Sequence, residues 1–318
     1  MASALRPRGV FVPLVTPFTE HDVVDLPALE ALASDALSAG AAGLIALATT
    51  GEPTSLDDAE RDAVVSTIAR ACADGGGALM VGAGTNDTRT TIARHEALAQ
   101  VPAVAAALAV VPYYVRPSEA AIVRHFQVVA ERSPVPLVIY NIPYRTGRGL
   151  GASALLELAA TDNVAGVKQA VGGIDADTLE VLAGAGDDFV VMGGDDAFLY
   201  PLVLMGGSGA VAASAHLCTE RFVQMIECGL EGRVAEGRAH AEALLPLVRW
   251  LFAEPSPAPV KAVLHAQGRI PTPHVRMPLG DASAEVAARA ISGARPAAEG
   301  QAPAGTGSPA GAVSRAGR

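Results

Sequence analysis

Aromatic residues, cysteine and long apolar runs are all scarce in this 318-residue sequence, and each scarcity excludes a class of protein. Only 4% of the residues are aromatic and acidic residues outnumber basic ones by 33 to 23, so the basic, aromatic-rich surface of a nucleic-acid-binding protein is missing. Apolar stretches such as Val101–Val111 fall well short of the roughly 20 residues that span a bilayer. We therefore expect no nucleic-acid partner and no membrane insertion.

Cysteine and histidine are too few and too widely spaced for a disulfide framework or a metal centre. The three cysteines are odd in number, which fits buried thiols in a reducing compartment. The seven histidines show no metal-ligand spacing. We accordingly predict a cytoplasmic protein without a metal site.

Short aliphatic runs alternate with longer stretches of helical periodicity, the pattern of βαβ units around a parallel sheet. Half of the residues are hydrophobic, which is typical of a globular protein with a large core. Eight strand–helix pairs within about 230 residues favour an α/β fold of the (β/α)8 TIM-barrel type over an open doubly wound sheet. The predicted strands are Val10–Thr16, Gly43–Ala48, Leu79–Gly82, Ala106–Val110, Leu137–Tyr140, Val164–Lys168, Phe189–Gly193 and Gly209–Ala213.

After Thr219 the strand pattern stops and helical periodicity continues, which predicts a C-terminal helical region. From about Ala294 the sequence is rich in Ala, Gly, Pro and Ser and has little to bury, so we predict a disordered tail. The predicted divisions are the barrel core (1–218), the last barrel helix with the C-terminal helical region (219–293), and the tail (294–318).

Lysine is nearly absent, because 21 of the 23 basic residues are arginine and only Lys168 and Lys261 are lysine. A guanidinium stays protonated, whereas a desolvated lysine can lose its proton and form an imine with a carbonyl. Lys168 ends an aliphatic strand, at the barrel face where TIM-barrel active sites lie. We predict that it is the reactive amine, the alternative being a lysine that reaches from the strand end into solvent. For Lys261, in a proline-rich part of the helical region, a solvated position on a helix face is the expectation.

Polar residues follow other predicted strands at the same face. Tyr140 ends the strand before that of Lys168, so its phenol is placed to relay protons, unless the ring only packs in the rim. Arg145 follows in the next turn and offers a planar fork suited to a carboxylate, although surface charge is the ordinary role of an arginine. Thr49 and Thr50 follow the second strand, with hydroxyls and amides suited to a small carboxylate or to proton transfer.

Two glycine-rich turns resemble the phosphate cradles of TIM barrels. Gly193–Asp196 is better explained as a strand exit with a helix N-cap, and Gly206–Gly209 as a tight turn into the last strand. We therefore do not predict a phosphate site there.

Five motifs in register carry a resemblance to one known family. Together they resemble the dihydrodipicolinate synthase and N-acetylneuraminate lyase family, from about Val10 to Leu279. The resemblance implies a (β/α)8 barrel with a C-terminal helical region, a homotetramer built as a dimer of dimers, and a Schiff base between a lysine and pyruvate or a related 2-oxo acid. The motifs are Thr49-Thr50-Gly51-Glu52, Pro112-Tyr113-Tyr114-x-Arg116-Pro117, Tyr140-Asn141-x-Pro143-x-Arg145-Thr146-Gly147, Gly166-Val167-Lys168 and Gly194-Asp195-Asp196.

The resemblance also assigns catalytic roles. Lys168 matches the Schiff-base lysine and Tyr140 the residue that donates and accepts protons. Thr49 and Tyr114 match the rest of the proton relay, with Tyr114 reaching into the site of the neighbouring subunit. The covalent imine with Lys168 then replaces any separate cofactor.

The resemblance assigns substrate-binding roles as well. Thr50 and Val211, the latter through its backbone, match positions that hold pyruvate, and Arg145 matches the residue that receives the carboxylate of the aldehyde substrate. The implied reaction condenses pyruvate with L-aspartate 4-semialdehyde to 4-hydroxy-tetrahydrodipicolinate, a step of lysine and diaminopimelate biosynthesis. Because Asp58 and Arg61 stand where lysine-inhibited synthases have other residues, we expect weak or absent inhibition by lysine.

Two alternatives remain open at this stage. The first is a pyruvate-dependent class I aldolase acting on a 2-keto-3-deoxy sugar acid or an N-acetylneuraminate-like substrate, because Tyr144 and the run Gln169–Gly172 differ from the usual synthase residues. The second is a non-catalytic barrel that binds pyruvate.

Overall fold

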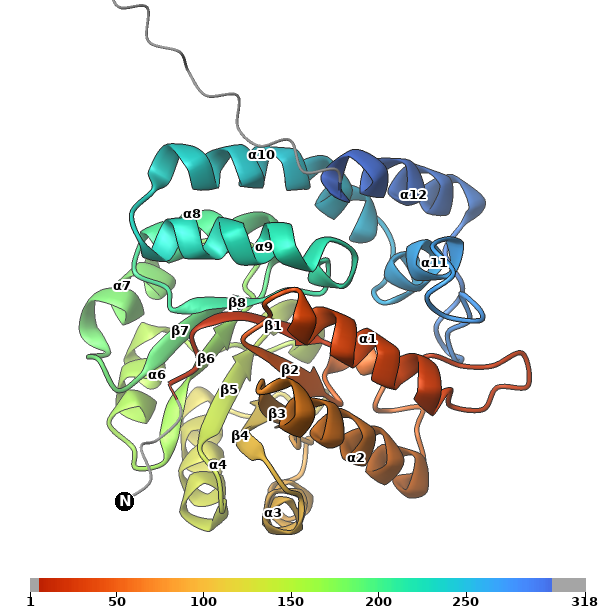
Figure 1. The fold of residues 1–318 in the computed structure, drawn as a ribbon. Helices are drawn as coiled ribbons and strands as arrows, with labels where there is room; N and C mark the ends of the chain where they lie inside the picture. The colour runs from red at the N-terminus through yellow and green to blue at the C-terminus, as the bar shows by residue number, and fades with distance from the viewer. Residues whose placement is uncertain (1–5, 299–318) are drawn as a thin grey trace, which may run out of the picture.

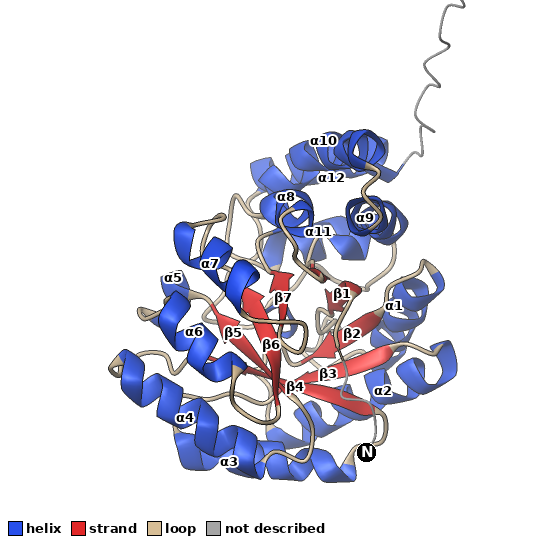
Figure 2. Ribbon diagram, turned by 90° about the vertical axis from the view of Figure 1, so that its left-hand side faces the viewer, coloured by secondary structure: helices blue, strands red, loops and turns tan. Residues whose placement is uncertain are grey.

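Eight parallel strands close into a barrel in the computed structural model, which describes residues 6–298 (Figures 1 and 2). Neighbours in the chain are neighbours in the sheet, and β1 pairs with β8 to close it. All eight predicted strands are present, with ends that differ by at most three residues. They are β1 Gly9–Pro13, β2 Gly43–Ala46, β3 Ala78–Gly82, β4 Val104–Val110, β5 Leu137–Asn141, β6 Val164–Gln169, β7 Val190–Gly193 and β8 Gly209–Val211. The predicted TIM-barrel fold is confirmed.

Helices surround the strands, and three further helices stack beside α8 and α9 (Figure 2). The helices of the barrel are α1 Leu26–Ser38, α2 Asp58–Gly75, α3 Thr88–Ala97, α4 Glu119–Arg132, α5 Pro143–Thr146, α6 Ala152–Ala159, α7 Ala176–Gly184, α8 Leu199–Leu204 and α9 Ala215–Leu230. Those of the C-terminal region are α10 Val234–Leu251, α11 Ala258–Ala266 and α12 Ala284–Ala298. Short 3-10 turns are η1 Thr49–Gly51, η2 Leu98–Gln100 and η3 Asp196–Phe198.

Side-chain caps start helices α1 and α2. The Asp25 carboxylate accepts the N–H of Ala28 at the start of α1. Asp57 and Glu60 form a reciprocal capping box at the start of α2. These bonds satisfy N–H groups that have no partner within the helix and so fix where α1 and α2 begin.

The inside of the barrel is filled by a layer of inward-facing side chains. It includes Phe11, Met80, Tyr140 and Val211, all less than a tenth exposed. Burying a large apolar side chain contributes about 1.5–3 kcal/mol, so this layer makes the barrel a packed core and not a pore. It also brings Tyr140 and Val211, which are 71 residues apart in sequence, into one cluster.

Helix α12 ends at Ala298, five residues beyond the predicted end of the helical region at 293. Ala294 and Ala297 are almost fully buried against the molecule, which extends the helix although their sequence looks tail-like. The rest of the predicted tail, 299–318, lies outside the described residues. Within 6–298, no helix combines the length and the apolar character needed to cross a membrane.

Candidate active site

Lys168 and Tyr140 lie side by side at the carboxyl ends of β6 and β5. Parallel pairing of the two strands places them in register. The Lys168 Nζ atom lies 3.9 Å from the centre of the Tyr140 ring. Lys168 is only 5% exposed, so the alternative of a lysine that reaches into solvent is wrong, and the predicted proximity to the phenol is confirmed.

Gly194 leaves the space that Lys168 occupies. A Cβ atom at position 194 would lie 2.8 Å from Lys168 Cε, closer than any normal carbon contact. The absence of a side chain just after β7 therefore shapes the chamber of the lysine, a role different from the phosphate cradle considered for this turn.

Two carboxyl groups follow Gly194 and lie close enough to feel the charge of Lys168. Asp195 occupies the N-cap position of η3 at the exit of β7, as predicted, but its carboxylate makes no capping bond and instead accepts the N–H of Gly172 at 2.7 Å. Burial raises the pKa of Asp195. It also raises the pKa of Asp196, to about 6, although a hydrogen bond from Ser214 and the charge of Lys168 oppose the shift.

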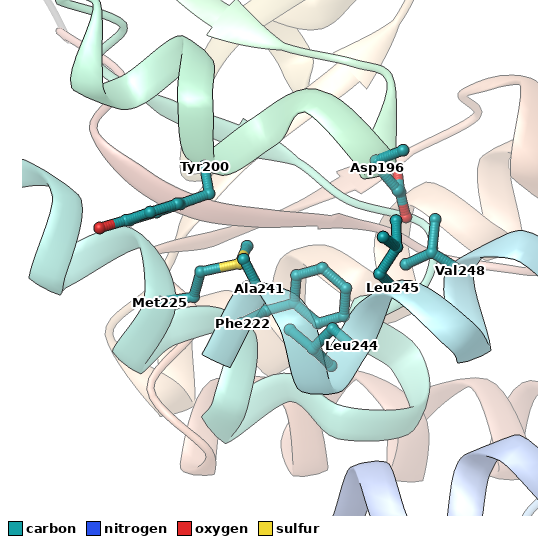
Figure 3. Close-up of a pocket in the computed structure, with 9 residues that line it drawn as sticks. Asp196, Tyr200, Phe222, Met225, Ala241, Leu244, Leu245 and Val248 are labelled. Carbon is teal, nitrogen blue, oxygen red and sulfur yellow. The ribbon is translucent and has the colours of Figure 1, made fainter. Parts of the chain in front are cut away.

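Asp196 also borders a small cavity between α8, α9 and α10 (Figure 3). Figure 3 shows its carboxylate on one side and Tyr200 on the other, with Phe222 and Met225 between them. The cavity has a volume of about 20 Å³, room for little more than one water molecule. It is too small to hold a substrate.

A much larger cavity, of about 630 Å³, opens at the carboxyl ends of strands β2 to β5. Thr49, Tyr140 and Arg145 line it together, so the structure brings these three predicted site residues to one space. Lys168 is not among its lining residues, but its amine lies 3.9 Å from the ring centre of Tyr140, which is one of them. Such a cavity has the size of a small-molecule site.

Four arginines line this cavity together with Glu52 and Asp58; they are Arg61, Arg94, Arg145 and Arg276. Arg276 is neutralised by ion pairs with Asp22 and Glu60, and Glu52 by Lys261, so the remaining three arginines against Asp58 leave the wall net cationic. Burial and the nearby charge of Arg94 lower the pKa of Arg61, which shows that the two guanidinium groups feel each other. The Arg145 guanidinium lies 5.0 Å from the Tyr144 ring centre and remains exposed. The cavity therefore suits anionic ligands such as carboxylates.

The remaining predicted residues fall into two groups. Thr50 and Val211 are buried, in η1 and at the end of β8. Tyr114 is 88% exposed, with a left-handed φ of 68°, and does not line the cavity of its own chain. Its predicted place in a neighbouring subunit therefore stays a prediction.

Lys261 is not the solvated lysine that the sequence predicts. It is completely buried, and its ammonium group donates to Glu52 Oε1 at 2.6 Å. Burial lowers the pKa of Lys261 to about 8, against the opposing effect of the Glu52 carboxylate. The proline-rich surroundings suggest an exposed segment, but α11 packs its helix face inward, and the ion-pair partner is 209 residues away in sequence.

One group of possible metal ligands is found among residues 6–298. Cys228, Glu236 and His240 bring their donor atoms within 4.8 Å of one another, on α9 and α10. Glu236 is already ion-paired with Arg233, and none of the three residues lines the large cavity. The three cysteines are buried free thiols, as predicted.

The comparisons with known proteins agree with this geometry. The family model described as the dihydrodipicolinate synthetase family matches residues 6–292. The chain belongs to this family. It is similar to the 4-hydroxy-tetrahydrodipicolinate synthase of Salinibacter ruber (38% identity over 281 residues, 88% of this chain and 91% of the relative). It is also similar to 4-hydroxy-tetrahydrodipicolinate synthase 1 of Halalkalibacterium halodurans (35% over 272 residues, 86% and 91%).

Solved structures of family members superpose over most of the chain. One is the dihydrodipicolinate synthase of Cyanidioschyzon merolae with lysine bound (TM-score 0.87, 30% identity, 91% of this chain and 98% of that one). Another is the chloride-inhibited enzyme of Acinetobacter baumannii complexed with pyruvate (TM-score 0.86, 28% identity, 90% and 98%). The resemblance inferred from the motifs is thus confirmed at the level of family and fold.

Sequence reasoning missed two features of this family member's site. The role of Gly194 depends on which atoms of the neighbouring strand β6 face it, which no spacing rule shows. The second feature is the buried ion pair of Lys261 with Glu52. The sequence carries a weak signal for it, because lysine is so scarce that a role is expected for Lys261 as well as for Lys168.

Proposed function

We propose that the chain is a Schiff-base lyase that condenses pyruvate with L-aspartate 4-semialdehyde to give 4-hydroxy-tetrahydrodipicolinate. The observation that carries the proposal is the buried Lys168 amine 3.9 Å from the Tyr140 ring, beside a cavity with cationic walls. The printed names of the relatives, 4-hydroxy-tetrahydrodipicolinate synthase, support the choice of reaction.

In the proposed mechanism the Lys168 amine, as the free base, attacks the ketone carbon of pyruvate. The ketone oxygen leaves as water with protons relayed by Tyr140, Thr49 and the Tyr114 of a neighbouring subunit. Loss of a methyl proton from the imine gives an enamine, whose carbon attacks the aldehyde. The amino group of the semialdehyde then attacks the imine carbon, which closes the ring and releases Lys168. The cationic imine is the electron sink, so the proposed reaction needs no separate cofactor.

We also assign the residues that bind the two substrate carboxylates. We assign the pyruvate carboxylate to the η1 turn, with Thr50, and to the backbone of Val211. We assign the carboxylate of the semialdehyde to Arg145, whose planar fork lines the cavity. The exposed, left-handed Tyr114 supports assembly into a homotetramer. The three free thiols support a cytoplasmic location.

A coupled turnover assay tests the proposal. The purified chain is supplied with pyruvate and L-aspartate 4-semialdehyde or, in a separate cleavage assay that detects released pyruvate, with a 2-keto-3-deoxy sugar acid alone. We expect turnover with the semialdehyde and at most a trace with the sugar acid. Turnover of the sugar acid alone would establish the aldolase alternative, and binding of pyruvate without turnover of either substrate would leave a non-catalytic barrel.

A further inference from the structure

Lys261, the second of the two lysines, holds a buried ion pair that reaches from the C-terminal region to the active-site turn. It belongs to α11, which lies between the strands and helices α10 and α12 in the view of Figure 2. Its Nζ atom donates to Glu52 Oε1 at 2.6 Å and to the His274 carbonyl at 2.8 Å, and lies 4.1 Å from the Phe18 ring centre. Both side chains of the pair are no more than 1% exposed.

A buried ion pair is not explained by stability alone. Removing two charges from water costs free energy that is often larger than the gain from their attraction. Proteins in which apolar residues of similar volume replace such a pair are frequently as stable. Lysine is also otherwise avoided in this chain, since only Lys168 shares the residue type. The position of the pair therefore points to a role in fixing the conformation of the active-site turn.

Glu52 ends the turn that carries Thr49 and Thr50. Its backbone N–H donates to the Thr49 carbonyl at 3.1 Å, and its φ of 54° is left-handed, a conformation that a non-glycine residue adopts only when its surroundings hold it. Its second carboxylate oxygen accepts the N–H of Arg276 at 2.9 Å. Both oxygens are thus fixed by segments more than 200 residues away in sequence.

We propose that Lys261 is a positioning residue, which through the buried ion pair with Glu52 holds the η1 turn so that Thr49 and Thr50 face the reacting pyruvate. The inference rests on the proposed function, because it assigns Thr49 and Thr50 to proton relay and substrate binding. Lys261 itself does not touch substrate. Without the Lys261 ammonium group, the buried Glu52 carboxylate loses its counter-ion and is expected to rotate toward solvent. The left-handed backbone at Glu52 would then relax and displace the η1 turn.

The test removes each partner and includes a matched control. K261M removes the charge and keeps an apolar stem, and E52Q removes the opposite charge and keeps the shape. R269M is the control, because Arg269 also ties the C-terminal part of the chain to the barrel, through Asp35 and the His216 carbonyl, without touching η1. For each variant, three quantities are measured: the melting temperature, kcat with both substrates saturating, and borohydride trapping of pyruvate on Lys168.

The expected signature is a joint loss of turnover and of trapping rate, with the trapping site unchanged. K261M and E52Q each lower kcat by about 10²-fold, the loss typical of a misplacement of about 1 Å, and slow the trapping of pyruvate because Thr49 and Thr50 act in imine formation, while the adduct still forms on Lys168. The double variant K261M/E52Q loses no more than either single variant, because the two residues act as a unit. R269M keeps kcat within about two-fold of the wild type at a comparable loss of melting temperature.

Two results would overturn the inference and leave the proposed function intact. One is a wild-type kcat in K261M; the other is a loss of kcat in R269M as large as that in K261M at the same loss of melting temperature. A wild-type chain that traps no pyruvate would instead refute the proposed function first. If K261M does not fold, E52Q gives the same readout, because glutamine keeps the shape of the buried side chain.

Discussion

Replacing Gly194 with alanine tests whether the chamber around Lys168 is shaped for catalysis. The new Cβ atom would lie 2.8 Å from Lys168 Cε and 3.0 Å from the Cβ atom of Ala170. Carbon atoms prefer separations of about 3.5–4.0 Å, so the end of the lysine must move by about 0.7 Å. The amine has little room to do so, because it is buried against the Tyr140 ring.

The size of the effect follows from that displacement. A misplacement of about 1 Å costs on the order of 10²-fold in rate, so we expect G194A to slow both borohydride trapping and turnover by about 10-fold to 10²-fold. Overpacking should also lower the free energy of unfolding by about 1–3 kcal/mol. The trapping rate is measured by mass spectrometry at saturating pyruvate, and stability by urea unfolding.

G193A is the matched control for this experiment. Its Cβ atom would lie 2.7 Å from Leu199 Cδ2, so it crowds the packing of helix α8 and leaves Lys168 alone. We expect a similar loss of stability with trapping close to the wild-type rate. Equal trapping rates in G194A and the wild type, or equal losses in both variants, would refute the reasoning.

Three further predictions follow from the structure. Y140F should lower kcat by about 10²-fold to 10⁴-fold with little change in stability, because it removes only the proton-relaying hydroxyl; a wild-type pH–rate profile in this variant would contradict the role. L-lysine at millimolar concentration should leave turnover unchanged, because Asp58 and Arg61 stand where lysine-inhibited synthases have other residues and because Arg61 and Arg94 repel its side-chain ammonium group; a dose-dependent fall in rate would contradict this. Stability should fall as the pH is lowered from about 6.5 toward 4, as measured by urea unfolding, because burial lowers the pKa of three histidines to about 4: His95, His125 and His216.

The sign of the pH effect follows from proton binding. Between the lowered folded pKa and the unfolded value of about 6.5, the unfolded chain binds more protons than the folded one, so the free energy of unfolding rises with pH. Asp195 and Asp196 act in the opposite direction, because burial raises the pKa of both, that of Asp196 to about 6, and the folded chain then binds the extra protons. Three histidines outweigh two carboxyl groups, so the net slope is positive. A flat or negative slope over this range would contradict the burial of neutral imidazoles.

The sequence carries the fold well because parallel strands buried on both faces leave a plain signal. Aliphatic runs such as Leu137–Tyr140 and Val164–Lys168 have that character throughout, and their spacing leaves room for one helix each. Strand ends are less visible, because they depend on pairing. Thr16, for example, continues the apolar run of β1, but its hydroxyl donates to the Gly51 carbonyl and the chain has left the sheet.

Some residues of the site can likewise be predicted from the sequence and others cannot. Lys168 and Tyr140 are predictable because adjacent parallel strands bring their carboxyl ends together, whatever the loops do. The buried position of Lys261 is not predictable, because it depends on a contact with Glu52, which is 209 residues away in the sequence. Asp195 follows a local capping pattern that tertiary contact overrides, since Gly172 supplies a better-placed donor than the short η3 turn.

The central claim is that one buried amine forms an imine with pyruvate, and the scarcity of lysine makes it directly testable. The wild-type chain is treated with pyruvate and borohydride, digested, and mapped by mass spectrometry for the peptides that contain Lys168 and Lys261. The account predicts one reduced pyruvyl group on Lys168 and an unmodified Lys261. No adduct at Lys168, or an adduct at Lys261 in its place, would contradict it.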